Sequence, residues 1–153
     1  MSNVKNIIIA GLGGQGVLKA SDILAEVVFN AGFDVKKSEI HGMAQRGGSV
    51  SSDIRFGPEV LSPMVPIGQA DFLVCIAEDQ VEPNKHKGGE IIVPSMIEQS
   101  KLANKRSINV ALLGKLSTKL DIDKTLWLQA IKDKLPEKLH DINIEAFELG
   151  RNS

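Results

Sequence analysis

The apolar residues follow two different periods, which separate predicted strands from predicted helices along the chain. Residues 49–56 alternate between apolar and polar and predict a half-buried strand. After the Gly57-Pro58 turn, residues 60–65 are expected to pair back on it as an irregular second arm. Short, mostly apolar runs predict the other strands, which are residues 4–10, 33–40, 71–77 and 90–93.

The helical period follows the first strand and returns in the last third of the sequence. Apolar residues recur at helical spacing from Val17 to Ala31, and Gly32 is a natural helix end. A second stripe runs from Ile108 to Leu120, and Asp123 is suited to cap the helix after it. The last helix is expected to open at Pro136 and end at Gly150, with Leu139, Ile142, Ala146 and Leu149 facing inward.

This order of elements predicts an α/β fold, a Rossmann-like three-layer sandwich with a mixed, mostly parallel sheet and C-terminal helices. With 153 residues, 42% of them apolar, the chain suits one domain over residues 1–153. No apolar run approaches the ~20 residues that span a bilayer. The N-terminus lacks the pattern of a signal peptide, so we expect a cytoplasmic protein without a membrane partner.

Composition excludes several classes of function. A net charge of -1 and an aromatic content of 4% give no reason to expect a nucleic-acid partner. The single cysteine, Cys75, lies in an apolar run that would raise its pKa, and one thiol cannot hold an iron–sulfur cluster. The three histidines show no metal-ligand spacing, and no nucleophile stands beside a base. We therefore predict neither a catalytic residue nor a metal site in this chain.

A glycine loop joins the first predicted strand to the first helix. Gly11, Gly13 and Gly16 have the spacing G-x-G-x-x-G, which is typical of phosphate binding at a helix N-terminus. The same glycines could instead serve only close packing between strand and helix. Glu39 stands near the place of a ribose-binding carboxylate, but the chain is too short for a complete dehydrogenase.

A second unusual loop covers residues 41–49 and follows the second predicted strand, so both loops are expected at one edge of the sheet. His41 could act as a general acid or base, or be a hydrogen-bonded structural residue. Arg46 could bind a phosphate or carboxylate, or serve as an interface contact.

Taken together, the two loops resemble the gamma-type domain of the 2-oxoacid:ferredoxin oxidoreductases, and in particular its indolepyruvate branch. The resemblance lies in Gly11-Leu12-Gly13-Gly14-Gln15-Gly16 and in the phrase His-Gly-Met-Ala-Gln-Arg-Gly-Gly-Ser at 41–49. It extends to residues 55–57, 62–63, 109–114 and 146–150, and the segment 78–107 is shorter than in the family.

The resemblance implies a non-catalytic subunit of a complex that converts an arylpyruvate, coenzyme A and oxidised ferredoxin into an acyl-CoA, CO2 and reduced ferredoxin. Thiamine diphosphate, Mg and the iron–sulfur clusters would belong to a large alpha subunit, and this chain alone would hold no cofactor. The pyrophosphate of coenzyme A is expected at Gly11, Gly13, Gly14, Gln15 and Gly16. The subunit interface or active-site wall is expected at Glu39, His41, Met43, Gln45, Arg46, Gly47 and Gly48.

The alternative is a stand-alone regulatory module that binds a nucleotide or coenzyme A on the same fold. The isolated chain would then be a monomer or a homodimer.

Overall fold

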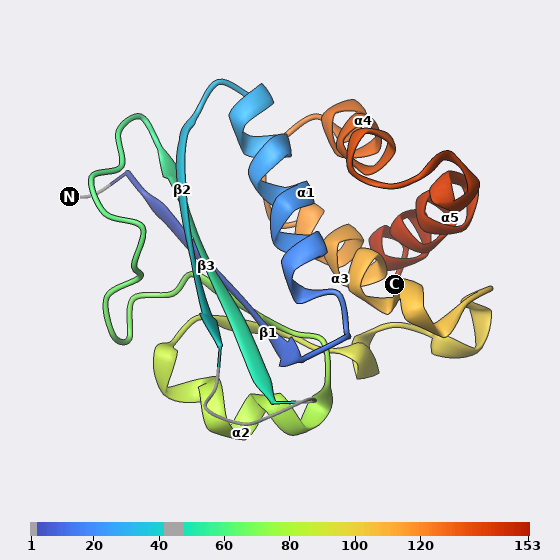
Figure 1. Cartoon of the computed structure of the whole chain (residues 1–153), viewed down its shortest axis with the longest axis horizontal. Helices are drawn as coiled ribbons and strands as arrows, with labels where there is room; N and C mark the ends of the chain where they lie inside the picture. The colour runs from blue at the N-terminus through green and yellow to red at the C-terminus, as the bar shows by residue number, and fades with distance from the viewer. Residues whose placement is uncertain (1–2, 42–47) are drawn as a thin grey trace.

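The computed structural model describes residues 3–41 and 48–153, and its centre is one five-stranded sheet in the order β2-β3-β1-β4-β5 (Figure 1). Its strands are β1 (Lys5–Leu12), β2 (Asp34–His41), β3 (Ser49–Gly57), β4 (Phe72–Cys75) and β5 (Glu90–Ile92). β1 pairs in parallel with β4, and β4 with β5, whereas β3 is antiparallel to both β1 and β2. Only β3 runs against the others, so the predicted mixed, mostly parallel sheet is confirmed.

The long helices cover one face of this sheet (Figure 1). They are α1 (Val17–Asn30), α3 (Ile108–Ser117), α4 (Lys124–Lys134) and α5 (His140–Arg151). Their apolar sides share a core with Ile7, Ile9 and Ile54 of the sheet, and with the fully buried Trp127 and Phe147. As predicted, Asp123 caps α4, since its carboxylate accepts a hydrogen bond from the Thr125 N–H at 2.9 Å.

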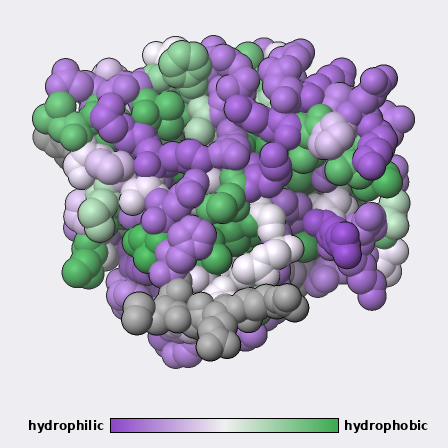
Figure 2. All heavy atoms as spheres, in the orientation of Figure 1, coloured by the Kyte–Doolittle hydropathy of each residue, from purple (hydrophilic) through white to green (hydrophobic). Residues whose placement is uncertain are grey.

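The opposite face has a much thinner cover. There the short helix α2 (Val81–Asn84), with its flanking 3₁₀ turns, and the loop 58–71 lie against a small cluster of apolar residues. This cluster consists of Ile8, Ala10, Ala70, Leu73, Cys75 and Val93. Hydrophilic side chains cover most of the surface visible in Figure 2, and hydrophobic ones reach it in separate places. The large exposed apolar side chains are Phe29, Ile40, Leu61, Met64, Ile67 and Met96.

The predicted second arm at residues 60–65 is wrong, because the structure has a loop there. Side chains of the sheet satisfy its backbone in place of a strand ladder. The Val60 N–H donates to Asp34 at 2.8 Å, the Val65 N–H donates to Asp53 at 3.0 Å, and Arg55 donates to the Ser62 carbonyl at 2.8 Å. Prolines at 58, 63 and 66 lack the N–H that regular pairing requires.

The predicted end of the last helix at Gly150 is also wrong, since α5 continues to Arg151. The buried positions of α5 are Asn143, Ala146, Phe147 and Gly150, so Ala146 is the predicted inward position that becomes fully buried. Gly150 allows α5 to cross α3 at close range and does not end the helix. A Cβ at Gly150 would lie 1.8 Å from the Ala111 carbonyl oxygen, and one at Gly114 would lie 2.1 Å from the Phe147 carbonyl oxygen. The backbones of α3 and α5 therefore touch at two glycines.

Replacing Gly150 with Ala is expected to destabilise the fold, although Ala is the better helix former by about 1 kcal/mol. The new methyl group would collide with the backbone of α3, and opening the crossing costs about 1–3 kcal/mol. Urea unfolding followed by circular dichroism measures the change. Glu145→Ala, on the exposed side of α5, is the matched control. Equal unfolding midpoints for the two variants would refute the proposed role of Gly150.

Candidate functional site

The glycine loop lies between the carboxyl end of β1 and the N-terminus of α1. Gly14 and Gly16 have φ of +86° and +82°, a region that side chains other than glycine rarely adopt. The Gly13 N–H donates to the Gly48 carbonyl at 2.8 Å, which ties this loop to the start of β3. Gln15 turns back, and its side-chain oxygen accepts the Leu12 N–H at 2.7 Å. The loop is thus a fixed turn.

The predicted residues of this loop have different roles in the structure. Gly11 still belongs to β1, and a Cβ there would lie 2.8 Å from the Val17 side chain, so Gly11 allows close packing of strand and helix. A Cβ at Gly14 would meet nothing within 4 Å, which shows that this backbone faces open space. Close packing therefore explains the glycine at position 11, whereas at position 14 the backbone is open and binding of a phosphate stays a prediction.

Asn109 joins the start of α3 to this loop. Its Nδ2 atom donates to the Gly16 carbonyl at 3.2 Å, and its Oδ1 atom accepts the Val110 N–H at 2.9 Å. A Cβ at Gly16 would lie 2.4 Å from that Nδ2 atom. The N-termini of α1 and α3 therefore meet at the same place, and both bring backbone N–H groups and a positive dipole end there.

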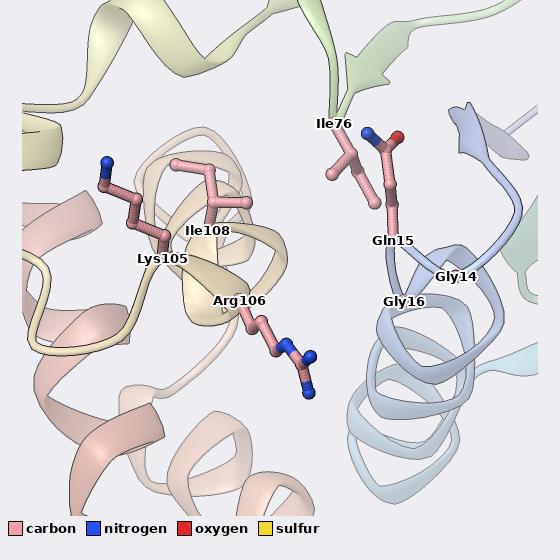
Figure 3. Close-up of a pocket in the computed structure, with 7 residues that line it drawn as sticks. All are labelled: Gly14, Gln15, Gly16, Ile76, Lys105, Arg106 and Ile108. Carbon is pink, nitrogen blue, oxygen red and sulfur yellow. The ribbon is translucent and has the colours of Figure 1, made fainter.

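A cavity of about 520 Å³ opens between the two helix starts (Figure 3). It is lined by Gly14, Gln15, Gly16, Ile76, Lys105, Arg106 and Ile108. Because β1 and β4 are parallel, this is the carboxyl edge of adjacent strands, where open α/β sheets bind ligands. The volume falls within the range of small-molecule sites, roughly 300–1,000 Å³.

Lys105 and Arg106 are the two site residues that the sequence analysis missed. Both are exposed, and neither forms an ion pair with another residue of 3–41 or 48–153. The side chain of Asn104 accepts the Arg106 N–H at 2.9 Å and so fixes the turn that carries both cations. The only signal in the sequence for these two site residues is that they form a basic pair just before the apolar stripe of α3. With the helix N-termini, this pair makes the cavity suited to an anion such as a diphosphate.

His41 lies on the other side of the glycine loop. It comes from the end of β2 and lines a second cavity of about 290 Å³ together with Gly13, Gly14 and Lys19. The structure thus brings His41 and Gly48 to the loop, as the shared-edge hypothesis requires. Met43, Gln45, Arg46 and Gly47 lie outside the described residues.

Glu39 does not line either of these cavities. Its carboxylate lies 3.2 Å from Lys37 Nζ, and Lys37 also bonds to Asp22 on α1. Burial lowers the pKa of Lys37, but its hydrogen bonds and the charges of Asp22 and Glu39 outweigh this effect and raise it. Glu39 therefore takes part in an ion-pair cluster that fastens β2 to α1.

The environment of Cys75 makes its thiol a weak acid. Burial raises the pKa of the Cys75 thiol to about 11, and the charge of Glu78 adds to the effect. Within 3–41 and 48–153, no group of three or more His, Cys, Asp or Glu residues is arranged to hold a metal ion. In the same part of the chain, no helix is long and apolar enough to cross a membrane.

Fold and site together define a Rossmann-like domain with a glycine loop and a cavity, lined by Lys105 and Arg106, at one edge of its sheet. Comparison with protein families identifies this domain. The model of the pyruvate ferredoxin/flavodoxin oxidoreductase family matches residues 6–95 and 79–153, and the chain belongs to that family. The predicted family is thereby confirmed, and the chain is of the kind that forms subunits of 2-oxoacid:ferredoxin oxidoreductases.

Curated relatives match over almost the whole chain. Indolepyruvate oxidoreductase subunit IorB of Thermococcus kodakarensis is 31% identical, with 95% of this chain and 93% of the relative covered. The subunit of the same name from Methanothermobacter thermautotrophicus is 29% identical, with 95% of both chains covered. The 2-oxoglutarate synthase subunit KorC of Methanocaldococcus jannaschii is 25% identical, with coverage of 95% and 91%.

Solved structures share the fold. The gamma subunit of the keto/oxoacid ferredoxin oxidoreductase from Geobacter sulfurreducens has a TM-score of 0.80 at 19% identity, with 99% of this chain and 96% of that chain covered. The 2-oxoglutarate:ferredoxin oxidoreductase from Magnetococcus marinus has a TM-score of 0.82 at 21% identity, with 99% of this chain and 31% of that chain covered. The predicted α/β fold is thus confirmed.

This chain is also shorter than its relatives in one region. The alignment with the Thermococcus subunit extends over 190 residues, more than the 153 residues of this whole chain. The match to the family model comes in two parts, which overlap at residues 79–95. Both findings agree with the predicted shortening within 78–107.

Cys75 is expected to resist thiol reagents in the folded protein at pH 8. A thiol with a pKa of about 11 keeps its proton there, and the thiolate is the reactive form. Labelling with a maleimide at pH 8, with and without denaturant, tests this. The folded protein should react at least about tenfold more slowly, and the difference should shrink as the pH rises toward 11. Equal rates at pH 8 would contradict the assignment of Cys75 as an inert core residue.

Proposed function

We propose that the chain is the non-catalytic subunit of a thiamine diphosphate-dependent oxidoreductase that acts on indolepyruvate or another arylpyruvate. The complex would decarboxylate the 2-oxoacid, transfer its acyl group to coenzyme A, release CO2 and pass the electrons to ferredoxin. The observation that carries this proposal is the similarity to indolepyruvate oxidoreductase subunits over 95% of the chain.

The distribution of chemistry between subunits follows from what the described residues offer. The only cysteine is buried and protonated, and no donor cluster suited to a metal ion occurs in 3–41 or 48–153. An iron–sulfur cluster, which needs about four ligands, therefore does not fit this part of the chain. We assign the clusters, together with thiamine diphosphate and its Mg, to the large alpha subunit, with which this chain would form the active complex.

We further propose that the cavity beside the glycine loop receives the diphosphate of coenzyme A. Backbone N–H groups at Gly14 and Gly16 and the start of α1 supply fixed donors without a Cβ in the way. Lys105 and Arg106 supply two positive charges on the facing wall, and neither is neutralised by a described carboxylate. Glycine loop and cations would thus hold the diphosphate from two sides, while His41 and the neighbouring loop face the alpha subunit.

We expect Lys105 and Arg106 to affect the KM for coenzyme A and not the KM for the 2-oxoacid. In the reconstituted complex, Arg106→Ala should raise the KM for coenzyme A about tenfold, because it removes a charge-assisted hydrogen bond worth about 1.4 kcal/mol. Lys105→Ala should act in the same direction, and Arg106→Lys should restore part of the loss. Steady-state kinetics with each substrate varied separately measures these effects.

Lys101→Ala is the matched control, since Lys101 is an exposed lysine on the preceding 3₁₀ turn and pairs with Glu98. An unchanged KM for coenzyme A in the Arg106→Ala and Lys105→Ala variants would rule out the cavity as the diphosphate site. The identity of the complex would stand even in that case.

The substrate of the complex can be tested directly. Ferredoxin reduction by the purified complex is expected to be fastest with indolepyruvate or another arylpyruvate and slower with pyruvate and 2-oxoglutarate. A preference for 2-oxoglutarate would instead assign the chain to a complex like that of its relative, the 2-oxoglutarate synthase subunit KorC. Isolation from its native cells as a lone monomer or homodimer that binds a nucleotide would overturn the whole proposal in favour of a regulatory module.

A further inference from the structure

A groove crosses the thinly covered face of the sheet, and Val50 lines both this groove and the smaller cavity beside the glycine loop. Two cavities of about 240 and 180 Å³ form it, and they share Ile40, His86 and Lys87. One wall is the loop at residues 64–67, and the other is the helical segment 80–87. Its floor comes from the sheet, with Ser51 and Asp53 of β3 and Ile8 of β1.

Large apolar side chains stand exposed along this groove. Ile67 is 88% exposed, Met64 57% and Ile40 44%. They are not on a loose segment, because the Val65 N–H donates to the buried Asp53 carboxylate at 3.0 Å, and Val65 packs on the core of this face. The loop backbone thus holds Met64 and Ile67 out toward the solvent. Covering each of them would contribute about 1.5–3 kcal/mol.

The match to the family model also divides at this groove. Its two parts overlap at residues 79–95, and this stretch includes the groove wall with His86 and Lys87.

The charges at the groove favour an acidic occupant. His86 and Lys87 stand where the two cavities meet, and Lys87 forms no ion pair with another residue of 3–41 or 48–153. Asp53 already accepts the Val65 N–H and is buried. A second copy of the chain is a poor occupant, because a two-fold interface would bring the same cationic groove against itself.

We propose that this groove docks a segment of the large alpha subunit that presents apolar side chains and at least one carboxylate. The apolar side chains would cover Ile40, Met64 and Ile67, and the carboxylate would pair with Lys87. This inference rests on the proposed function, since it requires the alpha subunit. It adds a docking face on the opposite side of the sheet from the long helices.

The test is the affinity of the purified chain for the co-produced alpha subunit, measured by biolayer interferometry. Met64→Asp and Ile67→Asp should each weaken binding about tenfold or more, because a charge would be buried against an apolar partner. Lys87→Glu should weaken it about threefold or more and reduce the salt dependence of the association rate. Circular dichroism should show native folding, because the three side chains lie at the surface.

Phe29→Asp is the matched control, since Phe29 is an apolar residue that is 65% exposed at the end of α1, on the other face. It should bind like the wild type. Unchanged binding by Met64→Asp and Ile67→Asp would overturn the inference, although wild-type binding would still support the proposed function. Loss of a homodimer in these variants, with unchanged alpha-subunit binding, would also overturn it and would identify a second copy as the occupant. Failure of the wild-type chain to bind the alpha subunit would instead overturn the proposed function.

Discussion

The contact between Gly16 and Asn109 is the constraint on which the candidate site depends. No side chain fits at Gly16, because the Asn109 amide occupies the place of its Cβ, and the same amide bonds to the Gly16 carbonyl. This single contact joins two helix starts that are far apart in the sequence. It places the cationic turn at 105–107 across the cavity from the glycine loop, and so it converts a common strand–turn–helix motif into one wall of a two-sided cavity.

The position of α3 depends in turn on its crossing with α5. Gly114 and Gly150 let the two backbones touch, so α5 supports α3 from behind while Asn109 fixes it in front. Helix packing on one face of the sheet therefore determines the geometry of the ligand edge. The other face carries a thin layer with exposed apolar residues, which suits contact with another subunit.

Much of this architecture could be predicted from local patterns. The alternation at 49–56, the apolar run at 7–9 and the glycine spacing each depend on neighbouring residues, and all correspond to elements of the structure. Errors arose where distant contacts decide. Residues 60–65 looked like a strand, but side chains of β2 and β3 satisfy their backbone as a loop. Gly150 looked like a helix end, but its role depends on Ala111, nearly forty residues earlier.

The sequence by itself determined the five strands of the sheet, the position of the glycine loop, the burial of Cys75 and the family, because these follow from short motifs and their spacing. Only the tertiary structure showed that Lys105 and Arg106 line the same cavity as the glycine loop, that Glu39 belongs to an ion-pair cluster, and that Met64 and Ile67 flank a groove. The neighbouring residues in the sequence do not reveal the function of an exposed cation or an exposed apolar residue. That function depends on which distant segment the fold places beside it.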